Sequence, residues 1–180
     1  MNRVAVAAFG PDRPGMVAAI TGVLMGHGGN LEDTSMTILR GHFAMMLVVG
    51  MPEGEAPAAL EEALSREVSA LGLTVVVRPL GDGTGMADEA SASSWSVSVY
   101  GSDRPGIVHR ITRLLADHGA NIVDLSTRVT GRLPDLLYVM LFDVTLGASA
   151  DVDRLQAELA TLSEELGVEA HIRPHESDVL

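Results

Sequence analysis

The sequence predicts an α+β protein of two βαββαβ units, each a four-stranded antiparallel sheet covered by two helices in the ferredoxin-like pattern. Three observations support this prediction. A phrase recurs 91 positions apart, as GPDRPGMVAAIT from Gly10 and GSDRPGIVHRIT from Gly101. A strand-like alternation precedes each copy, and the same order of helical and strand-like segments follows it. With 47% hydrophobic residues among 180, the chain can also form buried cores.

The first copy is expected to fold in the order strand, helix, strand, strand, helix, strand. Residues 3–9 alternate as a half-buried strand does. Pro14 suits the first turn of the helix that follows. That helix ends at His27-Gly28, where the glycine suits a helix C-terminus and the histidine suits the negative end of the helix dipole. The remaining elements are a hairpin of residues 30–40 and 43–51, a helix within 55–71 and a strand at 73–79.

The second copy repeats this order with a longer hairpin. Residues 95–100 alternate, Pro105 opens the first helix, and His118-Gly119 ends it. The turn of residues 130–135 is wider than Gly41-His42 in the first copy. The other elements expected are hairpin strands at 121–130 and 136–146, a helix within 150–166 and a strand at 168–174.

The repeat divides the chain into two domains, residues 1–80 and 95–175, joined by residues 81–94. The joining segment is rich in Gly, Ser, Ala and acidic residues, a composition typical of a flexible linker. Domains of about 75–80 residues have cores of marginal stability. We therefore expect the two domains to bury surface against each other, while homodimerisation stays open.

Composition narrows the range of functions. The net charge is −12, from 12 basic and 24 acidic residues, and every basic residue is arginine. Such a surface repels phosphates, so direct nucleic-acid binding is not expected. No apolar run approaches the roughly 20 residues that cross a bilayer, and the N-terminus does not resemble a signal peptide. The sequence thus predicts a soluble cytoplasmic protein that does not bind membranes.

Catalytic, cofactor and metal chemistry is not expected. The chain has no cysteine, and its six histidines show no metal-binding spacing. Ser35 and Ser126 recur at equivalent positions, but no recurring base accompanies them, as a hydrolase would need. The chain is therefore predicted to be no enzyme, with no catalytic residue, no metal site and no cofactor.

The repeated phrase has two interpretations. In the first, Asp12 and Asp103 cap the following helices by accepting backbone N–H groups near Gly15 and Gly106, and the phrase is only a helix start. In the second, the helix start is an anion site, because its first N–H groups lack partners within the helix and the dipole favours negative charge there. A nearby carboxylate suits an ammonium group, so the loop would fit a zwitterion such as a free amino acid.

Asn30 and Asn121 open the strand that follows each first helix. An asparagine side chain offers both a donor and an acceptor, so each could bind the same ligand from a partner half. The alternative is that Asn simply follows glycine in a turn, where it is common.

On this βαββαβ frame, the two phrases with the segments HGGNLEDTSM and HGANIVDLST make the chain resemble ACT domains, small regulatory modules that bind amino acids. Two such domains resemble the glycine cleavage system transcriptional repressor family, to which GPDRPGMV and NLEDTSMTILRGHFAMMLVV are especially similar. The resemblance implies ligand pockets built from the loop after strand one and the start of strand two, at the seam between paired domains. The residues it points to are Gly10, Asp12, Gly15, Asn30, Gly101, Asp103, Gly106 and Asn121.

The function implied by the resemblance is that of an amino-acid sensor. Its ligand would be glycine or a serine-like amino acid, and it would regulate transcription through a protein partner, a transcriptional activator, rather than through DNA. Relatives with serine-like ligands often carry Asn where this chain has Asp12 and Asp103, so the identity of the ligand stays open. Two alternatives remain: an interaction or assembly module with empty pockets, and a remnant of a formyltetrahydrofolate deformylase, whose amino-terminal domain carries a similar phrase.

Overall fold

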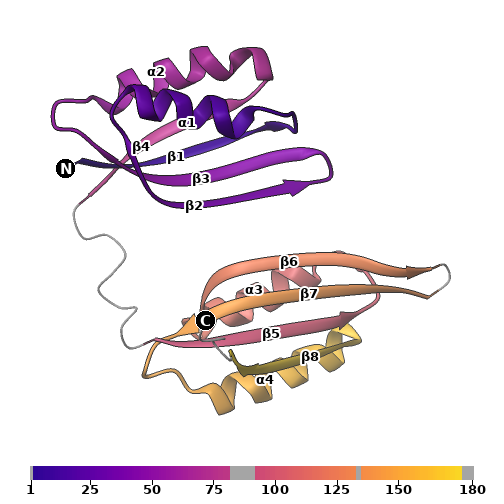
Figure 1. Cartoon of the computed structure of the whole chain (residues 1–180). Helices are drawn as coiled ribbons and strands as arrows, with labels where there is room; N and C mark the ends of the chain where they lie inside the picture. The colour runs from indigo at the N-terminus through magenta and orange to yellow at the C-terminus, as the bar shows by residue number, and fades with distance from the viewer. Residues whose placement is uncertain (1, 82–91, 133–134, 176–180) are drawn as a thin grey trace. The chain divides into compact units, whose positions relative to one another are not determined.

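The computed structural model describes residues 2–81, 92–132 and 135–175. The chain divides into two compact units, Met1–Thr84 and Gly85–Leu180, and both follow the element order expected from the sequence (Figure 1). The first unit contains β1 (Asn2–Pro11), α1 (Met16–Gly26), β2 (Asn30–Leu39), β3 (His42–Met51), α2 (Pro57–Val68), the short 3-10 helix η1 (Ser69–Leu71) and β4 (Thr74–Leu80). The second contains β5 (Ser93–Gly101), α3 (Ile107–Asp117), β6 (Asn121–Arg132), β7 (Asp135–Leu146), α4 (Val152–Leu166) and β8 (Val168–Pro174).

Each unit is a four-stranded antiparallel sheet with its first strand in the interior. The strand order is β2-β3-β1-β4 in the first unit and β6-β7-β5-β8 in the second. Two helices cover one face of each sheet, and no other described element of the same unit covers the second face (Figure 1). The predicted fold class, two ferredoxin-like α+β units, is confirmed.

The alternation along the strands selects the buried face. Val4 and Val6 of β1 point into the first core, where they meet Ile20 of α1, and all three are fully buried. Val97 of β5 and Ile111 of α3 occupy the same places in the second core. Each core is therefore a single layer between one sheet face and two helices, as the helical and strand periodicities of the sequence predict.

Two predicted segments fall partly outside the described residues. The linker predicted at residues 81–94 lies mainly within residues 82–91, which the structure does not describe, and β5 begins at Ser93. The wide turn predicted at residues 130–135 includes residues 133–134, which also lie outside the described ranges.

Glycines 10 and 101 of the repeated phrase stand where a side chain does not fit. A Cβ atom on Gly10 would lie 2.6 Å from the carbonyl oxygen of Gly72, in the turn before β4. A Cβ atom on Gly101 would lie 2.6 Å from Cγ1 of Val168. Both glycines therefore have a packing reason for their place in the phrase, whether or not they also contact a ligand.

Replacing Gly10 by alanine tests this packing. Gly10→Ala should lower the free energy of unfolding by about 1–3 kcal/mol, because the new methyl group must displace the Gly72 backbone. Gly22→Ala is the control, because it adds a methyl group to α1 with no other atom within 4 Å. The control should raise stability by about 0.5–1 kcal/mol. Urea unfolding followed by circular dichroism measures both, and equal effects would contradict close packing at Gly10.

Candidate functional site

The loops after β1 and β5 each start a helix through a glycine in the left-handed region. Gly15 is the N-cap of α1 with φ 95° and ψ −7°, and Gly106 is the N-cap of α3 with φ 94° and ψ −11°. These angles match the third position of a type II turn, with Pro14 and Pro105 at the second. The two prolines therefore lie in the turn before each helix, and the prediction that they belong to its first helical turn is wrong.

Asp12 and Asp103 do not cap these helices. Within the described ranges no side chain caps α1 or α3, and the N-cap glycine comes three residues after each aspartate. Asp12 is instead held through its backbone, whose N–H donates to the carbonyl oxygen of Gly41 at 2.9 Å. The capping interpretation of the phrase is therefore wrong, and both aspartates are left exposed.

In the first unit this loop borders a hollow of about 330 Å³ at the N-terminus of α1. The first hydrogen bond within the helix runs from the Ala19 N–H to the Gly15 carbonyl oxygen. The N–H groups of residues 16–18 therefore have no carbonyl partner inside the helix. The hollow is lined by Asp12, Arg13, Gly15, Met16, Val17 and Ala18, with Met36 of β2 and Phe43 of β3.

The electrostatics of this hollow suit a ligand with two opposite charges. The N-terminal end of α1 favours an anion through its N–H groups and its dipole, and the Arg13 side chain adds a positive charge. Asp12 supplies a carboxylate on the same lining. A zwitterion can satisfy both features at once, whereas a simple anion would leave Asp12 unpaired.

Within one unit, the structure separates the asparagines from the loops. Asn30 pairs with Gly50, which in turn pairs with Arg3 near the start of β1, whereas Asp12 and Gly15 follow the end of that strand. Asn121 lies in the same way near the start of β5. In each unit the predicted residues thus form two groups at opposite ends of the sheet: Gly10, Asp12 and Gly15 against Asn30, and Gly101, Asp103 and Gly106 against Asn121.

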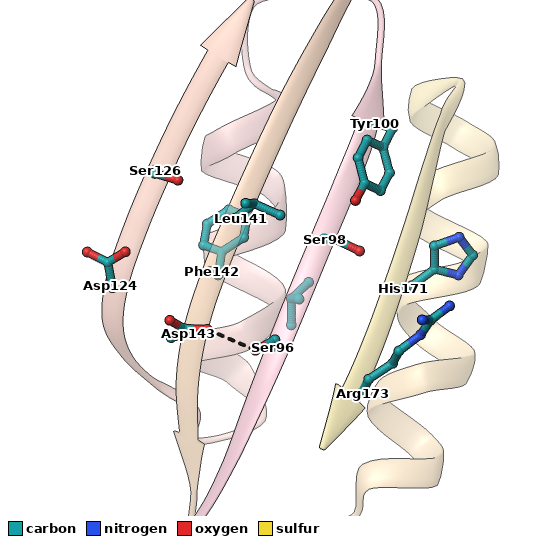
Figure 2. A pocket seen from close by; sticks show the side chains of 11 residues that line it. Ser96, Ser98, Tyr100, Asp124, Ser126, Leu141, Phe142, Asp143, His171 and Arg173 are labelled. Carbon is teal, nitrogen blue, oxygen red and sulfur yellow. Dashed lines mark hydrogen bonds between the residues drawn. The ribbon is translucent and has the colours of Figure 1, made fainter. Parts of the chain in front are cut away.

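The uncovered face of the second sheet carries a larger hollow, of about 480 Å³, which the sequence analysis did not find (Figure 2). Ser96, Ser98 and Tyr100 line it from β5. The sequence signal that could have indicated this hollow is the polar residue at every second position of β5. Six more side chains of this face come from the other three strands: Asp124, Ser126, Leu141, Asp143, His171 and Arg173.

One end of this hollow holds a serine, a histidine and an aspartate in contact. Ser96 Oγ donates to Asp143 Oδ1 at 2.9 Å, and His175 Nδ1 lies 2.8 Å from Ser96 Oγ and 3.5 Å from Asp143 Oδ1. In a catalytic triad the histidine contacts serine and carboxylate through different ring nitrogens. Here both contacts use Nδ1, so the cluster is a hydrogen-bonded polar group and not a charge-oriented nucleophile.

The histidines that follow α1 and α3 occupy the helix C-termini, as expected, and each meets a glutamate. His27 Nδ1 lies 2.5 Å from Glu55 Oε1, and His118 Nε2 lies 3.0 Å from Glu158 Oε2 of α4. Hydrogen bonds from His118 and then Arg154 hold the pKa of Glu158 below its ordinary value of 4.5. Each pair ties the end of the first helix to the segment that forms the second helix or leads into it.

The described part of the chain shows neither a metal-binding cluster nor a membrane-spanning helix. There, no group of three or more His, Asp or Glu side chains is placed to hold a metal ion. No helix among these residues has both the length and the hydropathy that a membrane span requires.

The duplicated βαββαβ units, each with a glycine-started helix beside an exposed aspartate, define a tandem protein of the ferredoxin-like α+β class. The sequence profile of the ACT domain matches residues 2–78 and 96–173, which cover both units. The chain therefore belongs to the ACT domain family.

Three similar proteins illustrate this relationship. A UPF0237 protein of Methanopyrus kandleri is 42% identical over 79 residues, which cover 43% of this chain and 88% of that protein. The glycine cleavage system transcriptional repressor of Escherichia coli is 26% identical over 169 residues, which cover 93% of this chain and 87% of the repressor. The crystal structure of an unknown protein from Galdieria sulphuraria superposes with a TM-score of 0.81 at 25% identity, covering 97% of this chain and 98% of that one.

The contacts that Glu158 makes with His118 and Arg154 can be tested through their pH dependence. Because the folded pKa of Glu158 is lowered, its carboxylate stabilises the fold above about pH 4.5, and this contribution is lost as the pH falls through the folded pKa. Glu158→Gln should therefore lower the melting temperature at neutral pH and matter less in acid. Thermal melts down to about pH 3 measure this difference, with Glu164→Gln on the same helix as the control for charge removal. A melting difference that stays constant across this range would contradict the assignment.

Proposed function

We propose that the chain is a regulatory protein that binds a small amino acid at the loop between β1 and α1, and at the equivalent loop between β5 and α3. The observation that carries this proposal is the hollow beside Asp12, where a carboxylate borders the N-terminal N–H groups of α1. The carboxylate of an amino acid would accept from the N–H groups of residues 16–18, and its ammonium group would pair with Asp12. Asp103 and the start of α3 would act in the same way.

The size of the hollow favours a small ligand. At about 330 Å³ it is near the lower end of the range of ligand pockets, roughly 300–1,000 Å³. Met36 and Phe43 supply its apolar wall, so little room remains for a long side chain. Glycine and serine are therefore the ligands we propose first. Asn30 and Asn121 lie at the opposite end of their own sheets, so we propose that each contacts such a ligand only from a partner half and not within its own unit.

We further propose that ligand binding regulates transcription through a protein partner. Membership of the ACT domain family and the similarity to the Escherichia coli repressor support a regulatory role. The net charge of −12 disfavours DNA as the direct partner and favours a protein such as a transcriptional activator. Such a regulator would act in the cytoplasm and would not itself be an enzyme.

Amino-acid titration tests the ligand proposal. Glycine or serine should raise the melting temperature of the wild-type chain, because a ligand that binds only the folded state stabilises it. The double variant Asp12→Ala with Asp103→Ala should bind about tenfold more weakly, since a charge-assisted pairing with the ammonium group is lost. Glu53→Gln is the control, because it removes an exposed carboxylate that has no side-chain partner among the described residues.

Two results would count against the ligand proposal. If none of the standard amino acids shifts the melting temperature, the chain is better explained as an assembly module with empty pockets. If the double variant loses stability but keeps the ligand response, the two aspartates hold the turns and do not contact the ligand.

The partner proposal predicts how the chain behaves on DNA. At physiological salt the purified protein should not be retained by DNA of the promoters it regulates, because an acidic surface gains nothing from releasing the counterions of DNA. Electrophoretic mobility shift over a range of salt concentrations measures this. Strong retention that falls steeply with added salt would show direct binding and would overturn the proposed mode of action.

A further inference from the structure

The two units carry different side chains on the same uncovered sheet face. Along β1 this face presents Ala5, Ala7 and the half-exposed Phe9. The positions 91 residues later on β5 are Ser96, Ser98 and Tyr100. All three changes replace an apolar side chain by one with a hydroxyl group, in strands that occupy the same place in their sheets.

The strands beside β1 and β5 show the same change from apolar to polar residues between the first and the second unit. Val48 of β3 pairs with Ala5, whereas Asp143 of β7 pairs with the equivalent Ser96. Val76 of β4 pairs with Ala7, whereas His171 of β8 pairs with the equivalent Ser98. The first unit shows that this fold forms with apolar residues at these places. The fold therefore does not require the hydroxyl groups of β5, Asp143 or His171, whereas Asp124 and Arg173 have counterparts in Asp33 and Arg78 of the first unit.

These groups surround a hollow and not a flat solvated surface. The small Ser96 and Ser98 lie along β5 in the middle of the 480 Å³ hollow, Leu141 lies between Ser98 and Ser126, and the larger Tyr100 and Arg173 lie further out (Figure 2). A volume of this size lies within the ordinary range of ligand sites, and the convergence of hydroxyl, charged and apolar groups is typical of them.

Opposite charges lie across the hollow. The strand register places Asp124, Asp143, Ser96 and Arg173 in one row across the four strands. Within the described residues, the side chains of Asp124 and Arg173 form no hydrogen bond or ion pair. Asp124 lies on β6 and Arg173 on β8, the two outer strands, whose backbones are three strand spacings or roughly 14 Å apart. The row therefore has an available carboxylate at one end and an available guanidinium at the other.

From this arrangement we infer that the open face of the second sheet is a second small-molecule site, separate from the loop site, for a zwitterion of about dipeptide length. Arg173 binds the carboxylate of the ligand, beside His171, whose Nε2 lies 2.9 Å from Glu169 Oε1, and Asp124 with Asp143 binds its ammonium group. The hydroxyl groups of Ser98 and Tyr100 bind the polar groups between the two charges. In a single amino acid the ammonium and carboxylate groups are bonded to the same carbon, so it cannot contact Asp124 and Arg173 at once. The two ends of a dipeptide lie about 7 Å apart, and the length of the arginine side chain covers the rest of the distance between the outer strands.

The probe for this site is glycylglycine, with the backbone amide signals of the intact chain followed by NMR. Glycylglycine should shift the signals of residues 96, 98 and 126, and Arg173→Gln should weaken its binding about tenfold, because a charge-assisted contact is lost. Arg78→Gln is the matched control, because Arg78 pairs with Ala5 as Arg173 pairs with Ser96. Ser98→Leu is a second variant, which fills the middle of the hollow and should abolish the shifts.

Blocked forms of the probe test each end. N-acetyl-glycylglycine lacks the ammonium group and glycylglycine amide lacks the carboxylate, so both should bind the wild-type chain about tenfold more weakly. The amide should bind wild type and Arg173→Gln equally. If the acetylated probe binds as well as glycylglycine, the site takes simple anions and the zwitterion assignment is wrong.

The same NMR experiment distinguishes the site on the open sheet face from the amino-acid site in the loops. Glycylglycine shifts at residues 96, 98 and 126 that need about tenfold more probe in Arg173→Gln and are absent in Ser98→Leu would support the sheet-face site even if free glycine and serine never bind. A response confined to residues 16–18 would support the loop site and overturn this one. Equal glycylglycine affinity for wild type, Arg173→Gln and Ser98→Leu would also overturn it.

Discussion

The central strand of each unit determines how the rest is arranged. β1 and β5 hydrogen-bond to a neighbour on either side, so their alternating side chains decide which face of the whole sheet is buried. Val6 and Val97 direct one face towards two helices, and those helices fill it completely. Since the described residues of each unit form only two α-helices, and both lie on one face, the second face has no cover from the described part of its unit. That face can change in sequence without disturbing the core, because its residues take no part in it.

The end of the same strand determines the geometry of the loop site. A helix can start directly after the turn only if one residue takes a left-handed conformation, and Gly15 and Gly106 do so in the two units. This leaves the first N–H groups of each helix without a capping side chain. In the first unit, the aspartate that could have capped them faces the hollow instead. An uncapped helix start costs stability, and a bound carboxylate that accepts from the same N–H groups would offset that cost.

The sequence was sufficient for the order of elements because each one repeats a period of two or of 3.6 residues, and because the second copy repeats the first. It also located the loops, since their residues are adjacent in the chain. Asp12 was predicted as the N-cap of the first helix because aspartate is common at N-cap positions. Only the backbone angles reveal that Gly15 is the N-cap of α1. The sequence did not reveal the polar hollow for another reason. Asp124 and Arg173 are far apart in the chain, and only the register of four strands places them in the same row of the sheet.

Duplication explains how the two kinds of surface coexist in one chain. The loop phrase kept its glycines, proline and aspartate in both units, as expected where backbone geometry leaves few alternatives. The uncovered faces diverged instead, towards alanine, valine and phenylalanine in the first unit and towards serine, tyrosine, aspartate and histidine in the second. A face that only meets water is normally polar, so the apolar first face is the costlier of the two to leave exposed. The two units are thus equivalent in backbone and in loop, but their open faces are suited to different chemistry.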